Sequence, residues 1–245
     1  MGTVITNMVA QTPEMEIVMG VDEFQPVAAP SYPVHKNIKD CQVSADTIIS
    51  YLRPTAIDDT KSLLDFGVAN SIPMIICTTG LTPELENAIE NAAKKVAVFY
   101  SGNMSLGINV FANILAKVSK LLYNSNFDIE LIEKHHNKKL DAPSGTAVML
   151  LDTIKEAVDH KLETVTDRTG TLAERSRNEI GISAIRGGNI IGEHSVIFAG
   201  QNERIEITHT AQSRNVFAEG TLKAAEFICG KPPGLYTMQD LINNL

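Results

Sequence analysis

Short apolar runs alternate with amphipathic segments along the first hundred residues. The apolar runs have the length and β-branched content of strands, at residues 16–20, 47–52, 74–77 and 96–100. The amphipathic segments repeat apolar residues at helical spacing, at residues 3–11, 55–69 and 83–94. Strands that alternate with helices predict βαβ units and a parallel sheet.

The pattern changes after residue 105. A long amphipathic helix, a strand and a second helix are predicted at residues 106–123, 127–133 and 144–158. Three β-rich runs follow, at residues 179–186, 190–198 and 204–210. They leave little room for crossover helices, which predicts an antiparallel or mixed sheet. Helices are expected again at residues 215–228 and 238–243.

This organisation predicts two domains. The first comprises residues 1–105 and 215–245, and the second comprises residues 106–214. We expect hinges where the chain crosses between them, near residues 104–106 and 213–215. The polar, glycine-containing segment 166–177 is predicted to be a mobile loop.

Composition narrows the class of protein. The chain has 245 residues, of which 44% are hydrophobic and 20% charged, as in a soluble globular protein. A net charge of -8 argues against nucleic acid or an acidic membrane as partner. The three cysteines, Cys41, Cys77 and Cys229, are too widely spaced for a disulfide framework or a metal motif. Neither a membrane-length apolar run nor a signal pattern is evident, so we expect a cytoplasmic protein.

Small and polar residues follow four of the predicted strands. They lie at residues 20–22, 52–54, 78–80 and 101–103. Each cluster alone could be an ordinary turn. In doubly wound sheets, however, ligands bind beyond the carboxyl ends of the strands, so four clusters at corresponding positions favour a ligand-binding edge.

The segment 135–147 combines groups that can transfer protons. His135 and His136 follow a predicted strand and point to opposite sides if that strand continues, so only one need face a reacting centre. Histidine transfers protons near neutral pH. Lys139 could donate a proton or hold an anion. Adjacent histidines are poorly placed to share a metal ion, and we expect no metal.

The same segment contains a helix start. Asp141 or Ser144 can cap the helix, and Pro143 favours a clean start. The free amides of Ser144, Gly145 and Thr146 would then lie at the positive end of the helix, where a carboxylate could bind. Taken singly, these features fit a surface histidine pair, a solvated lysine and a plain cap. Together they indicate an active site.

The run HHNKKLDAPSGTA at residues 135–147 closely resembles the HHxxKxDAPSGTA signature of the dihydrodipicolinate reductase family. This motif is long and specific, and the resemblance covers essentially the whole chain. Further matches are Arg186-Gly187-Gly188, Gly192-Glu193-His194, Glu206-Ile207-Thr208-His209, Ser213-Arg214, Phe217-Ala218-Glu219-Gly220 and residues 234–240.

The resemblance implies a fold and a reaction. The fold is α/β, with a Rossmann-type dinucleotide-binding domain and an α+β substrate and oligomerisation domain that contains a mixed sheet. The reaction is reduction of 4-hydroxy-tetrahydrodipicolinate to tetrahydrodipicolinate by NADH or NADPH, with loss of water, in diaminopimelate and lysine synthesis. Members of the family usually form homotetramers through the sheet of the substrate domain.

The resemblance also implies roles for single residues. His135 matches the catalytic acid/base and Lys139 the proton donor, while His136 matches a histidine that contacts the substrate. Ser144, Gly145 and Thr146 match the residues that hold a substrate carboxylate.

Two cofactor loops match the family as well. Cys77, Thr78 and Thr79 correspond to a loop near the nicotinamide, where the family often has glycine in place of Cys77. Ser101, Gly102, Asn103 and Met104 correspond to a second loop, and Arg53 lies in a strand-end loop that often approaches the cofactor.

The chain departs from the family at its start. Members begin with a strand and a glycine-rich GxxGxxG turn, and here Met1 and Gly2 match only the last part of that turn. The first strand and most of the turn are missing, so we expect weak or no dinucleotide binding by the chain as given. Asp22 follows Gly2 by about twenty residues, where a ribose-binding acid belongs. Asp22 and Glu23 would repel a 2′-phosphate, which modestly favours NADH.

Two other functions remain open. A different two-domain dinucleotide enzyme, acting on a semialdehyde or a sugar, would not need the histidine, lysine and Ser-Gly-Thr set. A cofactor-deficient, inactive or regulatory member of the family would fit the shortened start, but intact His135, Lys139 and Thr146 argue against it. Arg186 and Arg214 either add positive potential near a dicarboxylate or form structural ion pairs.

Overall fold

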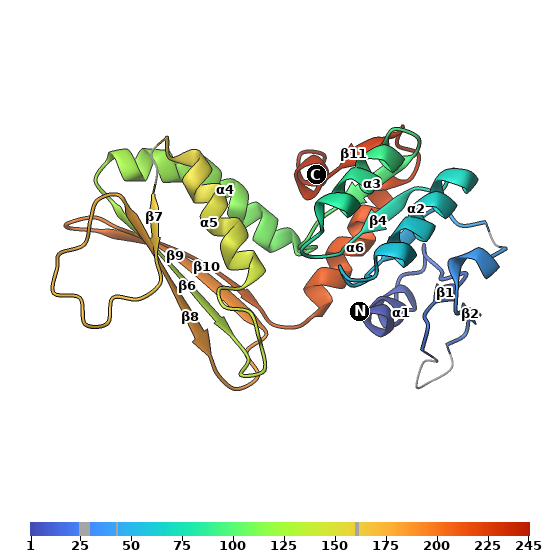
Figure 1. Ribbon diagram of the computed structural model, residues 1–245, viewed down its shortest axis with the longest axis horizontal. Helices are drawn as coiled ribbons and strands as arrows, with labels where there is room; N and C mark the ends of the chain where they lie inside the picture. The colour runs from blue at the N-terminus through green and yellow to red at the C-terminus, as the bar shows by residue number, and fades with distance from the viewer. Residues whose placement is uncertain (25–29, 43, 160–161) are drawn as a thin grey trace. The chain divides into compact units, whose positions relative to one another are not determined.

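The computed structural model describes residues 1–24, 30–42, 44–159 and 162–245. The chain divides into two compact units, drawn in Figure 1. The first unit comprises Met1–Leu106 and Asn215–Leu245, and the second comprises Gly107–Arg214.

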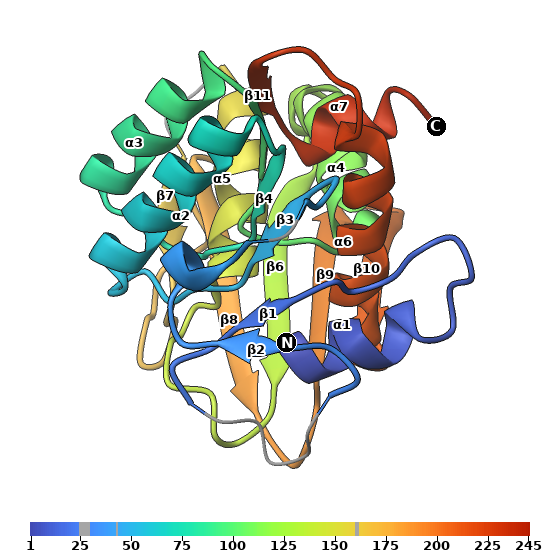
Figure 2. The same cartoon turned by 90° about the vertical axis from the view of Figure 1, so that its right-hand side faces the viewer.

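The first unit is built on a four-stranded parallel sheet in the order β11-β5-β4-β3. Its strands are β3 (Ile48–Ser50), β4 (Met74–Ile76), β5 (Ala97–Tyr100) and β11 (Gly234–Tyr236). Helices cover both faces, as Figure 2 shows: α2 (Ile57–Asn70) and α3 (Pro83–Ala93) on one, α6 (Asn215–Ile228) and α7 (Met238–Ile242) on the other. The predicted parallel α/β fold is confirmed.

Strand β4 explains why the sequence shows continuous apolar runs here. Met74, Ile75 and Ile76 are all completely buried. Met74 and Ile76 pack with α2 and α3, whereas Ile75 packs with α6 and α7. A strand that is covered on both sides has no polar face, so its sequence does not alternate.

A separate pair of short parallel strands, β1 (Gly20–Val21) and β2 (Val34–His35), also belongs to the first unit. The unit further contains α1 (Gly2–Val9) and a 3₁₀ turn at Ile38–Asp40. Within the described ranges β1 pairs only with β2, and β3 pairs only with β4.

The strand predicted at residues 16–20 was wrong in extent, since β1 begins only at Gly20. Met15 and Ile17 instead pack against the cluster in which Ile5 of α1 meets Leu222 of α6. Their apolar character therefore reflects helix packing and not strand pairing.

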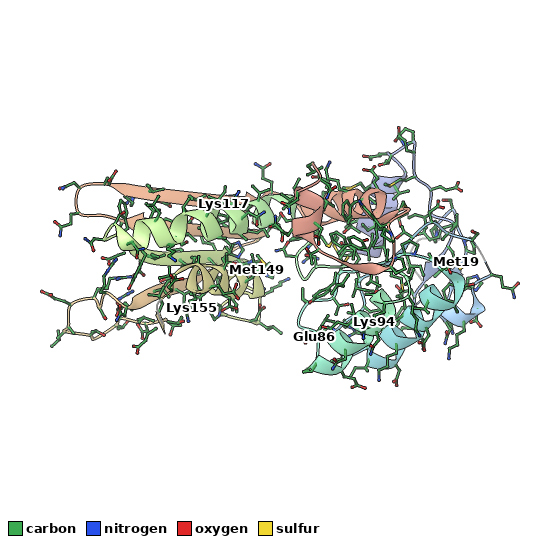
Figure 3. The ribbon with its side chains drawn as sticks, turned by 90° about the horizontal axis from the view of Figure 1, so that it is seen from above. Met19, Glu86, Lys94, Lys117, Met149 and Lys155 are labelled. Atoms are coloured by element: carbon green, nitrogen blue, oxygen red, sulfur yellow. The ribbon has the colours of Figure 1, made fainter. Side chains whose placement is uncertain are left out.

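The second unit holds a five-stranded mixed sheet in the order β10-β9-β6-β8-β7. Its strands are β6 (Asp128–His135), β7 (Glu163–Val165), β8 (Glu179–Arg186), β9 (Gly192–Ala199) and β10 (Arg204–Ala211). The central strand β6 runs parallel to β8 and antiparallel to β9, which confirms the mixed sheet. Helices α4 (Leu106–Asn124) and α5 (Gly145–Ala157) cover one face, and Figure 3 labels Lys117 on α4 and Lys155 on α5.

Helix α4 corrects one expectation. It has 19 residues and is apolar enough, by length and composition alone, to match a membrane span, so the statement that no run reaches that length was wrong. Ile108, Phe111 and Leu115 of α4 are buried in the core against the sheet. One face of this helix thus contributes to the core of the second unit, whereas Val110, Ile114 and Leu121 are exposed.

Arginines of the segment 166–177 bind acidic residues on the face of β6 that points away from the core. Arg168 donates to both carboxylate oxygens of Glu130, at 3.0 and 3.2 Å. Arg175 donates to Asp128 at 2.8 Å and to Glu130 at 3.0 Å. These contacts hold the segment at two points, and its predicted mobility stays a prediction.

Candidate active site

Strand β6 carries Glu133 and His135 on its core face. Residues along this strand alternate between partly buried and buried, so Ile129, Leu131, Glu133 and His135 point the same way. The strand extends to His135, two residues beyond its predicted end, and His136 follows outside it. A carboxylate and an imidazole therefore continue a row of core residues.

Glu133 is fully buried, and all of its hydrogen-bonding capacity is used. Its Oε1 accepts from the Ser144 amide at 3.0 Å and from Arg186 Nη2 at 2.7 Å. Its Oε2 accepts from Arg186 Nη1 at 2.8 Å and lies 2.5 Å from Nδ1 of His135. The sequence left the role of Arg186 open, and the structure makes it a bidentate ion pair with Glu133.

The charges of this cluster follow from these contacts. Burial alone would raise the pKa of the Glu133 carboxyl, but hydrogen bonds from Arg186, His135 and the Ser144 amide hold that pKa below its ordinary value. Burial lowers the pKa of His135 and outweighs the opposing effect of Glu133. The pair is therefore an ionised carboxylate beside a neutral imidazole.

His194 on β9 was named in the sequence only as part of a match, with no role. It is 4% exposed, and its ring lies 5.2 Å from that of His135 in an edge-to-face arrangement. Its Nε2 is 3.1 Å from Ser144 Oγ, while its Nδ1 has no hydrogen-bond partner among the described residues. Burial and the neighbouring His135 lower the pKa of His194 to about 4. His194 is thus a neutral member of the site.

The start of α5 differs in one respect from its predicted form. Ser144 is the N-cap, and its Oγ accepts from the Ala147 amide at 3.1 Å. Its own amide donates to Glu133, so it is not the free donor that the sequence suggested. A buried amide must find a partner, and the carboxylate of Glu133 lies within reach. Gly145 is exposed, and an added Cβ there would meet no atom within 4 Å.

Lys139 and Asp141 lie between the two histidines and the helix start. Lys139 Nζ forms an ion pair with Asp141 Oδ1 at 2.8 Å, and the lysine side chain is 20% exposed. Burial would raise the pKa of Asp141, but the hydrogen bond from Lys139 and a further bond from the Gly145 amide lower it. A carboxylate thus already lies at the helix start, which shows that this position suits an anion. His136 is partly buried, and its carbonyl accepts from the Lys139 amide at 3.2 Å.

In the first unit, hydrogen bonds join the segments that follow β3, β4 and β5. Thr78, which is 2% exposed, donates to the Leu52 carbonyl at 2.9 Å. The Ser101 amide donates to the Ile76 carbonyl at 3.2 Å. Cys77 is buried, which raises its pKa to about 12, whereas Thr79 is exposed. Three of the predicted strand-end clusters therefore meet at one edge of the sheet.

The segment 101–104 folds back on itself. Ser101 Oγ donates to the Asn103 carbonyl at 2.7 Å and accepts from the Asn103 amide at 3.2 Å. Met104 is buried. An ideal Cβ on Gly102 would meet only Tyr100 Oη, at 3.8 Å, so the surface at this glycine is open.

The remaining predicted cofactor residues lie around α1 and β1. Helix α1 begins at Gly2 after Met1, its first turn has no side-chain cap, and the space around Gly2 is open. Asp22 follows β1 and accepts from the Phe24 amide at 3.0 Å. Arg53 and Glu23 approach to 3.9 Å, and both are exposed. In the described part of the chain no three His, Cys, Asp or Glu side chains are grouped to hold a metal ion.

The first unit is a parallel sheet covered by helices on both faces, and the second is an α+β unit that buries an acid–base pair beside a helix start. These features define the class as a two-domain α/β enzyme. Comparisons with known proteins identify the family. The family models "Dihydrodipicolinate reductase, N-terminus" and "Dihydrodipicolinate reductase, C-terminus" match residues 1–104 and 107–242. The chain belongs to the dihydrodipicolinate reductase family.

Sequence relatives cover the chain throughout. It is 48% identical over 244 residues to the 4-hydroxy-tetrahydrodipicolinate reductase of Clostridium novyi, an alignment that spans 100% of this chain and 94% of that protein. The enzyme of the same name from Clostridium tetani is also 48% identical, over 100% of this chain and 93% of the relative. A dipicolinate-bound dihydrodipicolinate reductase from Paenisporosarcina sp. TG-14 has a TM-score of 0.79 at 22% identity, over 100% of this chain and 95% of that one, and supports the fold.

Proposed function

We propose that this chain catalyses the reaction for which its relatives are named. It reduces 4-hydroxy-tetrahydrodipicolinate to tetrahydrodipicolinate, with loss of water and with a nicotinamide cofactor, in the synthesis of diaminopimelate and lysine. The observation that carries this proposal is the identity of 46–48% over 99–100% of the chain to relatives of that name.

The two units take different roles in this proposal. The first unit binds the dinucleotide, with the weak affinity that the sequence leads us to expect, and the second binds a small dicarboxylate and assembles the chain into a homotetramer. The solved neighbour from Paenisporosarcina is described as dipicolinate-bound, which is consistent with a dicarboxylate ligand in this fold. We place the enzyme in the cytoplasm, with neither nucleic acid nor membrane as partner.

The first unit offers suitable groups for the cofactor. The strand ends after β3, β4 and β5 meet at one edge, and the open surface at Gly102 permits close approach of a ligand. The uncapped start of α1 at Met1 and Gly2 suits a phosphate. We assign the cofactor contacts to the residues that the family resemblance indicates: Met1, Gly2, Asp22, Cys77, Thr78, Thr79, Ser101, Gly102, Asn103 and Met104.

Asp22 bears on the choice between NADH and NADPH. Its carboxylate would accept a ribose hydroxyl and repel a 2′-phosphate. We therefore expect a modest preference for NADH. Rates with the two cofactors would test this, and a strong preference for NADPH would contradict it.

The bound cofactor supplies the hydride, and the side chains of the second unit supply the proton and hold the substrate. His135 or Lys139 provides the proton.

The Gly145 amide, the Thr146 side chain and His136 hold a substrate carboxylate. Ser144 contributes through its hydroxyl, because its amide is bonded to Glu133. A substrate carboxylate would take over the contacts of Asp141 with Lys139 and the helix start.

The test is a direct assay that follows NADH oxidation with substrate generated in situ. His135→Gln and Lys139→Met should each lower kcat by roughly 100-fold with smaller changes in KM, as expected for loss of a proton-transfer group. Lys138→Met is the matched control, because Lys138 is an exposed lysine in the same turn. Thr146→Val should act mainly on KM. Near-normal turnover in both the His135 and Lys139 variants would contradict the proposal. So would the absence of turnover by the unchanged chain with either cofactor at a concentration high enough to offset weak binding.

A further inference from the structure

A completely buried carboxylate next to a candidate catalytic histidine needs an explanation. Glu133 is 0% exposed, and it stands where β6 would otherwise present an apolar core residue. Burying an ionised group is unfavourable unless the surrounding groups compensate it. The partners of Glu133 should therefore show what the carboxylate does.

Those partners come from three different elements. Arg186 at the end of β8 lies directly opposite His135 in the parallel register and forms the bidentate pair with Glu133. His135, two residues along β6, contributes Nδ1 at 2.5 Å. The amide of Ser144, the N-cap of α5, donates at 3.0 Å. One carboxylate thus connects the histidine to the helix start that the proposed function assigns to substrate binding.

The contact with Glu133 determines which nitrogen of His135 carries the proton. An ionised carboxylate can only accept hydrogen bonds, so Nδ1 of the neutral imidazole must carry the hydrogen and Nε2 must carry the lone pair. Nε2 is directed toward Gly192, where an ideal Cβ would lie 3.2 Å from it. Glycine at this position leaves space beside the nitrogen that can exchange a proton.

We propose that Glu133 is a positioning residue that holds His135 as the Nδ1–H tautomer, with Nε2 as the proton-transfer atom, and ties this histidine to the start of α5 through the Ser144 amide. This inference rests on the proposed function only because it assumes that His135 transfers a proton in the reaction. The charged and titratable groups around His135 are Glu133, Lys139, Arg186 and His194.

The first experiment needs no substrate. Nitrogen-15 NMR of the histidine rings in the full chain, with His135 assigned by comparison with His135→Gln, should show Nδ1 protonated and Nε2 unprotonated at neutral pH. In Glu133→Gln this preference should be lost, because an amide can donate to Nδ1 as well as accept from it. The matched control is Glu130→Gln, since Glu130 lies on the same strand and also pairs with arginines, but outside this cluster. It should leave the His135 signals unchanged.

The second experiment measures kinetics on the same variants. Glu133→Gln should lower kcat by on the order of 100-fold, the range for loss of a correctly oriented acid–base group. The limb of its pH profile that reports the titration of His135 should move to lower pH, because Glu133 raises the pKa of His135. Glu130→Gln should keep the kcat and the pH profile of the unchanged chain.

These outcomes separate the inference from the proposed function. If His135 loses its preference for the Nδ1–H tautomer in Glu133→Gln, and the unchanged chain has no reductase activity, the positioning role is supported and the proposed function is defeated. An active enzyme whose His135 carries its proton on Nε2, or in which Glu133→Gln keeps its kcat and pH profile, would overturn the positioning role alone. The NMR measurement on the unchanged chain keeps the inference testable if Glu133→Gln does not fold.

Discussion

Replacement of Gly220 by alanine should destabilise the first unit although alanine is the better helix former. Gly220 lies buried within α6, in contact with the backbone at Met104. A Cβ added at Gly220 would overlap the Met104 carbonyl oxygen, and it would lie 2.9 Å from the carbonyl carbon and 3.7 Å from the Leu106 amide nitrogen. Both neighbours are backbone atoms, so the helix or the 101–104 segment must move.

The two opposing contributions can be compared. Alanine in place of glycine in a helix interior gains about 1 kcal/mol. Forcing a backbone shift in a packed core costs roughly 1–3 kcal/mol. Because the overlap at Gly220 is with a carbonyl group, we expect the upper part of that range and a net loss of about 1–2 kcal/mol. A protein of this size should then melt about 2–8 °C lower, at about 2–4 °C per kcal/mol.

The matched comparison is Gly67→Ala. Gly67 is likewise a buried glycine inside a helix, but its added Cβ would meet the sulfur end of the Met74 side chain. A methionine side chain can adopt another rotamer, whereas a backbone carbonyl cannot. Denaturant unfolding of the two variants should therefore show a clearly larger loss for Gly220→Ala. The Gly220 variant should also bind NADH more weakly, because Met104 belongs to a proposed cofactor segment. A Gly220 variant as stable as the unchanged chain would refute the reasoning.

Two further changes test the site and the cofactor edge. His194 has a folded-state pKa of about 4 against an ordinary value of 6.5, so its contribution to stability is complete above pH 6.5 and is lost as the pH falls toward 4. That difference of about 2.5 pH units corresponds to at most about 3 kcal/mol in the free energy of unfolding. In His194→Gln, the free energy of unfolding measured between pH 7 and pH 4 should lack this dependence on pH. If it changes with pH as steeply as in the unchanged chain, the assignment to His194 is contradicted. Thr78→Val removes the hydrogen bond to the Leu52 carbonyl, so it should lower the free energy of unfolding by about 1 kcal/mol. It should also weaken NADH binding. Thr79→Val, at an exposed neighbour, should affect NADH affinity only, and equal losses of stability in both variants would show that the buried bond is unimportant.

The elements that could be predicted from the sequence are those with a pattern of their own. The buried strand β4 is a continuous apolar run, and α3 has helical spacing with Pro83 in its first turn. The strands that were missed are β2, β7 and β11, of two or three residues each. Such short strands are defined by the strand that pairs with them, as β8 pairs with β7. A pattern within two or three residues cannot indicate that pairing.

The candidate site shows the same division between local and long-range information. His135, Lys139 and Ser144 lie within ten residues of one another, so their combination is visible in the sequence. Arg186 and His194 join them only through strand register, in which Arg186 faces His135 and His194 faces Glu133.

The correction at Ser144 shows how this register changes the chemistry. The sequence predicts that three helix-start amides are available to a substrate carboxylate, but the Ser144 amide is bonded to a buried carboxylate eleven residues earlier. The arginine that could have held the substrate is bound to the same carboxylate. Two of the expected anion contacts are thus bonded to Glu133 beside His135, and in the proposed function the exposed Gly145 amide and Lys139 hold the substrate. The positive charge of Arg186 therefore supports the histidine, so its replacement should disturb proton transfer before it disturbs substrate affinity.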